Sequence, residues 1–344
     1  MASISALSAC VPSQKIENDY FKQWHDADAI KTAVDLVGLN TRYWAPKYVT
    51  TVNLNVQAAQ SLLDEAPLGE GLTGTLQDHI DVLIFVTQTP DALMPGMAYK
   101  AHAALGLPDS CICISVNAGC SGYVENVALA SDLLECRSGK YALVLVGDVL
   151  SHYLDTTDRS TALIFGDAGT ATLVDNVSTA HKEKRRAYVG GCRSSGMNSI
   201  QLPLPETEAP NPPALIMNSM EVFNFTISQI PKFIKAVQKS WTDKFNQAPE
   251  EDLFLLHQAN KMILQHVSKK MKIPADKLPI NIQNFGNTSG ATIPLLMLDL
   301  LKQGKTFEDK KILMLGFGVG LGWGAMIMET APIHSTGLSF YTPK

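Results

Sequence analysis

The sequence predicts an α/β protein, and three observations lead to that fold class. Four short apolar runs in the first half are typical of strands buried on both faces, at residues 82–86, 112–116, 142–146 and 162–165. Stretches with apolar residues at helical spacing separate these runs, and a similar alternation returns later in the 344-residue chain. Strands that alternate with helices form α/β folds, and we expect a largely parallel sheet in the first half.

The expected helices and strands follow one another in a regular order. In the first half, small and apolar residues recur at helical spacing over residues 98–107 and 123–135. The second half should contain a helix at 222–245, a strand at 252–256, a helix at 259–271, a helix after Pro294 and a strand pair within 311–329.

A faint internal echo suggests two related halves. Each half ends in an apolar strand, a glycine-rich turn and a second apolar strand, as in ALIFGDAGTATLV and ILMLGFGVGLGWGAMIM. We therefore expect one unit over residues 1–180 and another over 181–344, with the boundary near 176–190. Residues 181–186 (HKEKRR) should form a solvated loop, and the proline-rich residues 203–213 a loop that covers a pocket.

Composition excludes several classes of function. A net charge of −5 argues against a general nucleic-acid binder, because such binding depends on clustered Lys and Arg. The amino terminus lacks the basic region of a signal peptide, and no apolar stretch approaches 18 residues. The six cysteines lack the dense spacing of a disulfide scaffold and are expected to be reduced. The cytoplasm is the expected compartment, with no membrane association.

Cys120 is the first candidate for chemistry. In VNAGCSGYVENVALA it stands where a buried strand ends and a helix begins. A thiol at a helix amino terminus has a lowered pKa, because the macrodipole and the unpaired N–H groups stabilise the thiolate. From this segment alone, a buried cysteine that acts as a small hydrophobe remains the commoner alternative. Cys111 and Cys113 are interpreted in that way, since a lone CxC is weak evidence for a metal site.

His257 and Asn287 are the next candidates. His257 follows the apolar strand DLFLL and opens HQANKMILQHV, again at the carboxyl end of a strand, where α/β sheets collect their ligands. A structural histidine is an equal alternative there, and His266 is interpreted as surface or packing. Asn287 lies in NFGNTSGATIP, where in isolation it would be a cap or an Asx turn. The glycines from 316 to 324 lack the following helix and acidic residue of a dinucleotide site.

Six motifs together resemble the ketoacyl-acyl-carrier-protein synthase III family, in its order and over roughly residues 1–330. They are NAGCSG, DTTDRSTALIFGDAG, EVFNF, HQAN, GNTSGATIP and GFGVGLGWGA. The resemblance implies a thiolase-like fold, in which two pseudo-equivalent βαβαβ-type halves form a layered α/β/α/β/α core. It also implies a homodimer and an acyl carrier protein as partner.

The chemistry implied by the resemblance is a decarboxylative Claisen condensation. Cys120 would take an acyl group from a primer thioester, and His257 and Asn287 would act on the malonyl donor. Loss of carbon dioxide leaves an enolate, which two neutral hydrogen-bond donors can stabilise. The backbone N–H groups of Cys120 and Val319 would form the oxyanion hole of the acyl-enzyme. The reaction needs no cofactor or metal, only an acyl-CoA or acyl-carrier-protein and a malonyl thioester.

Departures from the family pattern concern the binding of substrates. By our alignment Thr32 and Leu36 stand where the family has a tryptophan and an arginine that hold the adenine of coenzyme A. Met94 occupies a position that is often aromatic and lines the partner subunit's acyl pocket. Arg159, in the TDR motif, is retained. The residues expected from the resemblance to bind substrate are Arg159, Met94, Phe223 and Gly318.

A basic helix face supplies a candidate docking surface. Lys261, Lys269 and Lys270 lie on the helix after HQAN and are the expected contacts of the acyl carrier protein, with a solvated helix face as the plainer alternative. Two other functions stay open. One is an acyltransferase of the same fold that passes the acyl group to an alcohol or amine, and the other is a structural subunit whose partner does the chemistry. No role is assigned to residues 330–344.

Overall fold

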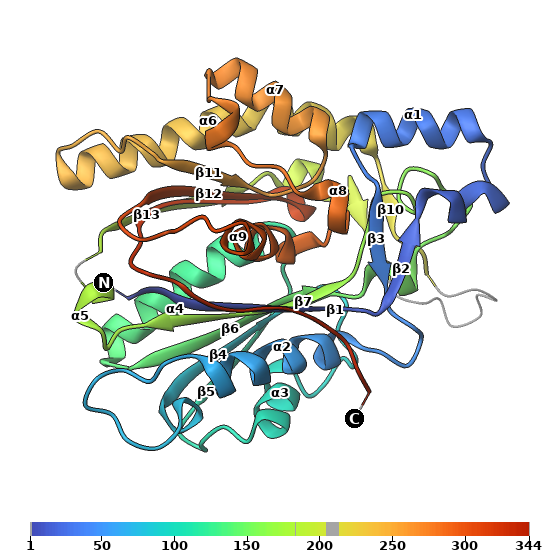
Figure 1. The fold of residues 1–344 in the computed structure, drawn as a ribbon. Helices are drawn as coiled ribbons and strands as arrows, with labels where there is room; N and C mark the ends of the chain where they lie inside the picture. Colours follow the sequence, from blue (N-terminus) through green and yellow to red (C-terminus); the bar gives the residue numbers. More distant parts are fainter. Residues whose placement is uncertain (1, 183, 204–212, 344) are drawn as a thin grey trace.

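The computed structural model describes residues 2–182, 184–203 and 213–343, and two stacked sheets organise it (Figure 1). The larger sheet has, in spatial order, β14 (His334–Phe340), β1 (Ser3–Val11), β7 (Ala168–Asp175), β6 (Tyr141–Asp148), β4 (Ile80–Val86) and β5 (Ile112–Val116). The smaller sheet has β11 (Leu253–Leu256), β12 (Lys311–Gly318), β13 (Gly322–Glu329) and β8 (Arg186–Cys192). Two short pairs flank them, β2 (Gln14–Glu17) with β3 (Thr41–Trp44) and β9 (Ile200–Gln201) with β10 (Ile216–Met217).

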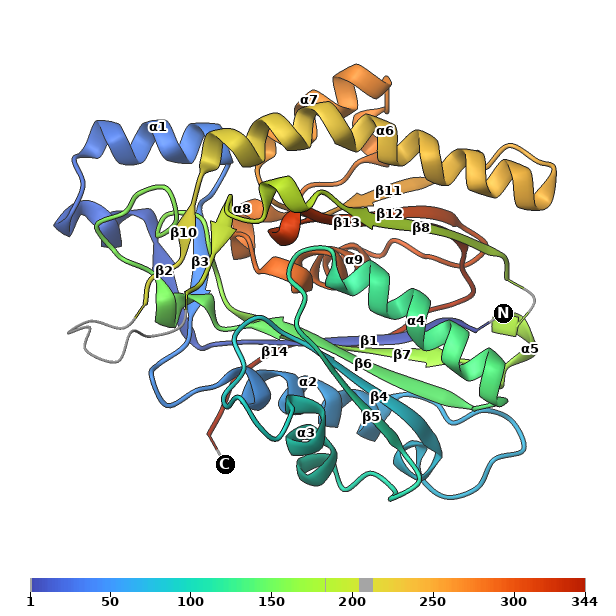
Figure 2. The same cartoon turned by 180° about the vertical axis from the view of Figure 1, so that it is seen from behind.

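Helices fill the three layers around these sheets (Figures 1 and 2). Between the sheets lie α4 (Gly122–Arg137) and α9 (Thr292–Lys302). The outer face of the larger sheet carries α2 (Thr51–Glu65) and α3 (Met97–Leu105), and the outer face of the smaller sheet carries α6 (Ser219–Phe245) and α7 (Lys261–Met271). The shorter helices are α1 (Ala27–Val37), α5 (Thr179–Lys182) and α8 (Ile282–Phe285). This is the expected layered α/β fold.

The central helices are buried because their sequences are apolar on nearly every side. In α9 the run TIPLLMLDLLK exposes little to solvent, as expected for a helix that packs against sheets above and below. In α4 the small residues Ala128 and Ala130 let the helix lie close to both sheets. One apolar cluster therefore runs from β1 and β6 through α4 and α9 to β12 and β13.

The expected helices and most of the expected strands are present. The runs at 82–86, 112–116 and 142–146 pair in parallel as expected, since β4 is parallel to both β5 and β6, but each sheet as a whole is mixed. In the larger sheet β7 runs antiparallel to both β1 and β6. In the smaller sheet β13 runs antiparallel to both β12 and β8. Near-continuous apolar runs are typical of parallel strands, but the antiparallel β7 is buried along its whole length as well, so burial does not by itself fix the direction of a strand.

The strand predicted at residues 162–165 is wrong. The segment is a series of turns, and only Phe165 forms an isolated bridge, with Asn287. It can be apolar and buried without a ladder because other groups satisfy its carbonyls. Arg42 Nη2 donates to Leu163 O at 2.9 Å and Trp44 Nε1 to Phe165 O at 3.0 Å.

The solvated loop predicted at residues 181–186 is also wrong for part of its length. His181 lies in α5 and Arg186 begins β8, and both side chains are buried. Arg186 Nη2 lies 2.7 Å from Asp132 Oδ1 and 3.1 Å from Glu135 Oε1, so two carboxylates of α4 compensate its charge. Most of the proline-rich loop, residues 204–212, lies outside the described residues. The division of the chain at residue 180 stays a prediction.

In the described part of the chain, no helix combines the length and the apolar character needed to cross a membrane. Residues 330–344, for which the sequence predicts no role, contain the strand β14. This strand pairs in parallel with β1 and forms one edge of the larger sheet. At the other edge lies β5, which is paired on one side, with β4.

Candidate active site

A cavity of about 420 Å³ brings the three candidate residues Cys120, His257 and Asn287 together. It lies beside the amino terminus of α4, which Figure 2 shows between the two sheets. Apart from these three, its walls are mainly apolar, and they include Leu150, Phe165, Ile200, Leu215, Met217 and Phe317. The composition of the walls fits an apolar ligand with a few polar groups at one end.

Cys120 is held by the close approach of β12. A Cβ atom on Gly318 would lie 3.0 Å from Cys120 Sγ, and one on Gly316 would lie 2.6 Å from the Cys120 carbonyl oxygen. A side chain at either position would displace the loop before α4. The glycine run therefore serves a packing contact with the thiol, which agrees with the rejection of a dinucleotide site.

The Cys120 thiol is protonated in the free enzyme. Burial raises its pKa to about 12, the Ser289 hydroxyl lowers it through a contact at 3.9 Å, and the carboxylate of Asp148 raises it. The α4 amino terminus acts in the opposite direction to burial. The lowered pKa expected from the sequence is thus outweighed by a loss of solvation that the sequence does not reveal.

His257 is a buried, neutral imidazole. Its backbone N–H donates to Leu315 O at 2.9 Å, which continues the pairing of β11 with β12. This bond ties His257 to β12, the strand that contacts Cys120. The Nδ1 atom lies 2.7 Å from Thr292 Oγ1, and the ring meets Phe317 edge to face at 5.2 Å. Burial lowers the pKa of His257 to about 3, so the imidazolium form is absent at neutral pH.

Asn287 is anchored at both backbone groups and at one side-chain atom. Its N–H donates to Ile164 O at 2.9 Å, and its carbonyl accepts from Gly166 N at 3.1 Å. The side-chain Oδ1 accepts from Ser289 N at 2.9 Å. Because the amide oxygen is engaged by a backbone donor, the amide NH₂ group is the part of Asn287 left to donate a hydrogen bond in the cavity.

The structure places the other expected residues in two groups. Phe223, Gly318 and Val319 line the cavity, with Val319 directly after the glycine that touches the thiol. Arg159 and Met94 are not among the lining residues, and Met94 has 84% of its surface exposed. Their roles in substrate binding stay predictions. Lys261, Lys269 and Lys270 are exposed on α7.

Two residues that sequence reasoning missed contribute to the site. Ser289 contacts the thiol and Thr292 contacts the imidazole. Leu36, which the sequence marked only as a departure from the family pattern, lines the cavity with 48% of its surface exposed. Ser289 and Thr292 stand in the motif GNTSGATIP, so the motif was found but its hydroxyl groups were not singled out. Ser289 also has a positive φ of 54°, an uncommon backbone conformation that recurs at functional sites.

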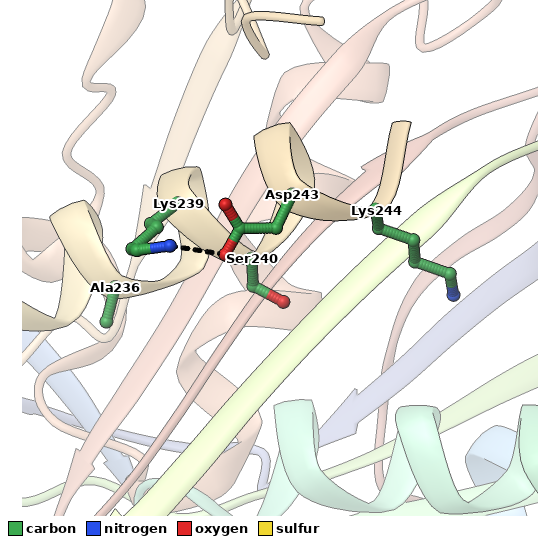
Figure 3. Close-up of a pocket in the computed structure, with 5 residues that line it drawn as sticks. All are labelled: Ala236, Lys239, Ser240, Asp243 and Lys244. Atoms are coloured by element: carbon green, nitrogen blue, oxygen red, sulfur yellow. Dashed lines mark hydrogen bonds and ion pairs between the residues drawn. The ribbon is translucent and has the colours of Figure 1, made fainter. Parts of the chain in front are cut away.

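A second pocket, on the surface of α6, lacks the features of a functional site. Figure 3 shows five residues of α6 that line a surface pocket, namely Ala236, Lys239, Ser240, Asp243 and Lys244. Its Lys239–Asp243 ion pair, at 2.5 Å, is a solvent-exposed pair one turn apart, a common arrangement of little energetic weight. Among the described residues, no group of three or more His, Cys, Asp or Glu side chains is arranged to hold a metal ion.

Comparison with known proteins identifies the family. Residues 114–189 match the 3-oxoacyl-[acyl-carrier-protein] synthase III family, and residues 246–330 match the carboxyl-terminal region of the same enzyme. The beta-ketoacyl-[acyl-carrier-protein] synthase III of Streptococcus sanguinis is 33% identical over 95% of this chain and 98% of its own. The enzyme of the same name from Streptococcus uberis is 34% identical over 81% of this chain and 84% of its own. The chain belongs to the ketoacyl synthase III family.

Solved structures agree with this assignment. The 3-oxoacyl-(acyl-carrier protein) synthase from Burkholderia xenovorans is 34% identical, with a TM-score of 0.87 over 99% of this chain and 97% of its own. OleA from Xanthomonas campestris, at 18% identity and a TM-score of 0.80 over 96% of each chain, shares the fold alone. The thiolase-like fold and the resemblance inferred from the motifs are confirmed. The chain is a ketoacyl synthase III-like condensing enzyme, and therefore an acyltransferase.

The raised thiol pKa predicts how Cys120 responds to pH. Iodoacetamide reacts with thiolate, so its rate at Cys120 should rise about tenfold per pH unit between pH 7 and pH 9 without a plateau, because the pKa is about 12. The measurement is peptide mapping by mass spectrometry, which separates Cys120 from the exposed Cys136 and Cys192. A plateau below pH 8 would mean that the α4 amino terminus outweighs burial.

The contact at Gly318 predicts a second effect. Gly318→Ala should shift the thiol and slow acylation of Cys120 by roughly 100-fold, the usual scale for a displacement of about 1 Å. Gly320→Ala is the matched control for space, since nothing lies within 4 Å of a Cβ there, although its φ of 119° adds strain. Acylation of the Gly318 variant at the wild-type rate, in a mass-shift time course, would contradict this account of the contact.

Proposed function

We propose that Cys120 carries the acyl group and that His257 and Asn287 stabilise the enolate formed from a malonyl thioester. One observation carries the proposal: a single apolar cavity is lined by a buried thiol, a neutral imidazole and an amide whose oxygen is already engaged. Such a set can accept an acyl group and then donate hydrogen bonds to a developing anion.

The first half-reaction is an exchange between two thioesters. The sulfur of Cys120 forms a bond to the primer's carbonyl carbon, the primer's carbon–sulfur bond breaks, and the thiol proton passes to the departing thiolate. The exchange is close to thermoneutral, so the acyl group stays transferable. Because the Cys120 pKa is about 12, the proton leaves the sulfur as the bond forms rather than beforehand.

The second half-reaction makes the carbon–carbon bond. The bond between the malonyl carboxylate and its methylene carbon breaks, carbon dioxide departs, and the electron pair moves to the thioester oxygen as an enolate. The Asn287 amide and the His257 imidazole donate hydrogen bonds to that oxygen. The enolate carbon then attacks the acyl group on Cys120, with the new oxyanion held by the N–H groups of Cys120 and Val319. Collapse releases the β-ketoacyl product, and the thiolate takes a proton from water.

The alternative is transfer of the acyl group to an alcohol or amine without carbon–carbon bond formation. That reaction needs a general base whose pKa lies near the working pH. The low pKa of His257, about 3, disfavours this role, and Asn287 cannot act as a base. Release of carbon dioxide in step with product separates the two reactions.

The proposal predicts that the two half-reactions respond differently to changes at Asn287. Asn287→Ala should leave acylation of Cys120 intact and lower decarboxylation and condensation by roughly 100-fold, as for loss of one oxyanion donor. Acylation is measured by intact mass and decarboxylation by release of labelled carbon dioxide, with Cys120→Ala as the blank for acylation.

A matched variant separates the role of Asn287 as a hydrogen-bond donor from its role in the turn. Asn287→Asp retains an oxygen that can accept from Ser289 N but removes the NH₂ donor. It should keep the thermal stability of the parent and still lose decarboxylation. Decarboxylation restored by Asp, or an equal loss of both half-reactions in Ala, would assign Asn287 a role in the turn alone.

A homodimer is the quaternary structure that we propose. The edge strand β5 has the apolar sequence ICISV and is only half-buried in the monomer. Tyr99, on the helix α3 that contacts β5, is exposed, and so are Leu93 and Met94 in the segment before α3. Exposed apolar side chains together with an unpaired strand edge favour a second copy. We propose that in such a dimer Met94 lines the acyl pocket of the partner subunit, the role expected from the resemblance. The cytoplasm as the compartment of the protein likewise stays a prediction.

The residues at the entrance of the cavity favour an acyl carrier protein as the partner. Leu36 and Met220 line the cavity, and both side chains are exposed to solvent. The rim of the cavity is therefore apolar at a place where binding of a nucleotide would need a charged or aromatic side chain. Thr32, the other departure, is exposed on α1. Lys261 stands at the start of α7, directly after the lining residue Asn260. Lys269 and Lys270 lie about 12 Å further along the helix.

These lysines predict a preference between carriers. With the same acyl group, kcat/KM should be higher for the acyl carrier protein than for coenzyme A, and it should fall as salt is raised. Lys269→Glu with Lys270→Glu should lower kcat/KM for the carrier protein by about tenfold and leave coenzyme A substrates unaffected.

Charge reversal elsewhere provides the control. Lys302→Glu with Lys305→Glu changes the net charge equally at the end of α9, where both lysines are exposed, and should have little effect. Equal kcat/KM for both carriers would contradict the preference. A fall in the α9 control as large as in the α7 variant would assign the effect to net charge rather than to docking on α7.

A further inference from the structure

We infer that Thr292 is a positioning residue that sets the tautomer of His257. Its hydroxyl donates to Nδ1, so the ring carries its single proton on Nε2 and presents a donor to the cavity. The inference rests on the proposed function, because the donor is the one required for the enolate oxygen.

The distances around Thr292 indicate where its hydroxyl proton lies. Thr292 is the first residue of α9 and is buried, and its Oγ1 lies 2.7 Å from His257 Nδ1 and 3.1 Å from Ser289 O. Hydrogen bonds donated by O–H groups cluster near 2.7–2.8 Å and rarely exceed about 3.0 Å, whereas those donated by N–H groups cluster near 2.9–3.0 Å. The short contact to Nδ1 therefore fits an O–H donor.

The Ser289 carbonyl does not need the hydroxyl. It already accepts a hydrogen bond from the backbone N–H of Thr292, in the turn that leads into α9. The hydroxyl proton is thus free to point to the imidazole without leaving a buried acceptor unpaired. One residue uses its backbone to hold the Ser289 turn and its side chain to orient His257.

Among the described residues, no charged side chain shifts the pKa of His257. Burial is the cause of the lowered His257 pKa, and Phe317 covers the ring edge to face. A carboxylate at Nδ1 would hold a proton there and leave Nε2 as an acceptor, which is the arrangement of a general base. A hydroxyl donor has the opposite effect. Since His257 stays neutral, its tautomer alone decides whether it donates to or accepts from a ligand.

The direct test is nitrogen NMR of the free enzyme labelled at histidine. The eight histidines give separable pairs of ring-nitrogen signals, and His257→Gln identifies the pair that belongs to His257. We expect a protonated Nε2 and an unprotonated, hydrogen-bonded Nδ1. A protonated Nδ1 in the free enzyme would overturn the inference, whatever the activity.

Two variants test the hydroxyl itself. Thr292→Val keeps the shape of the side chain and removes the donor, so the Nδ1 signal should lose its hydrogen-bond shift and decarboxylation should fall about tenfold, while acylation of Cys120 changes less than about twofold. Thr292→Ser restores the hydroxyl and should restore both readouts. Wild-type decarboxylation in the Val variant, or no rescue by Ser, would overturn the positioning role.

The outcome is separable from that of the proposed function. Should the wild-type enzyme acylate Cys120 but release no carbon dioxide, the proposed condensation fails, yet the NMR result still decides the tautomer. Should condensation proceed with Nδ1 protonated, the proposed function stands and the inference about Thr292 fails.

Discussion

The contact between β12 and the loop before α4 is the constraint on which the site depends. β12 belongs to the smaller sheet and α4 lies between the sheets, and they meet where two glycines bring backbone against Cys120. The same strand pairs with β11 and so fixes His257 through its N–H bond to Leu315 O. The turn at Asn287 is tied in its place to residues 164–166. Small shifts between the layers would therefore move all three side chains relative to one another.

Much of the fold and part of the site could be predicted from the sequence because each rests on a local signal. Helical spacing located α4 and α6, and a strand followed by a turn and a helix located Cys120 and His257. Local signals also explain the errors. Residues 162–165 look like a strand but are buried as turns, because Arg42 and Trp44, more than 100 residues away, satisfy their carbonyls. The sequence around Arg186 suggests a solvated side chain, but Arg186 is buried and two carboxylates of α4 compensate its charge.

The electrostatics of the site could not be predicted for a related reason. A helix amino terminus is visible in the sequence and lowers the pKa of a thiol, whereas the loss of solvation depends on everything that covers it. Around Cys120 that cover includes β12 and the turn with Ser289, both far along the chain. The same holds for His257 and Thr292, 35 residues apart, whose contact follows only from the packing of α9 under β11.

An apolar site with neutral groups has opposite consequences for the two half-reactions. Burial makes the thiolate of Cys120 costly, which slows any step that starts from a free thiolate. In the second half-reaction the same low polarity strengthens each hydrogen bond to the enolate oxygen. A charged imidazole would hold the carboxylate of the malonyl group as strongly as the enolate and would gain nothing in the transition state. Neutral donors in an apolar cavity thus stabilise the enolate that forms more than the malonyl carboxylate that enters with the substrate.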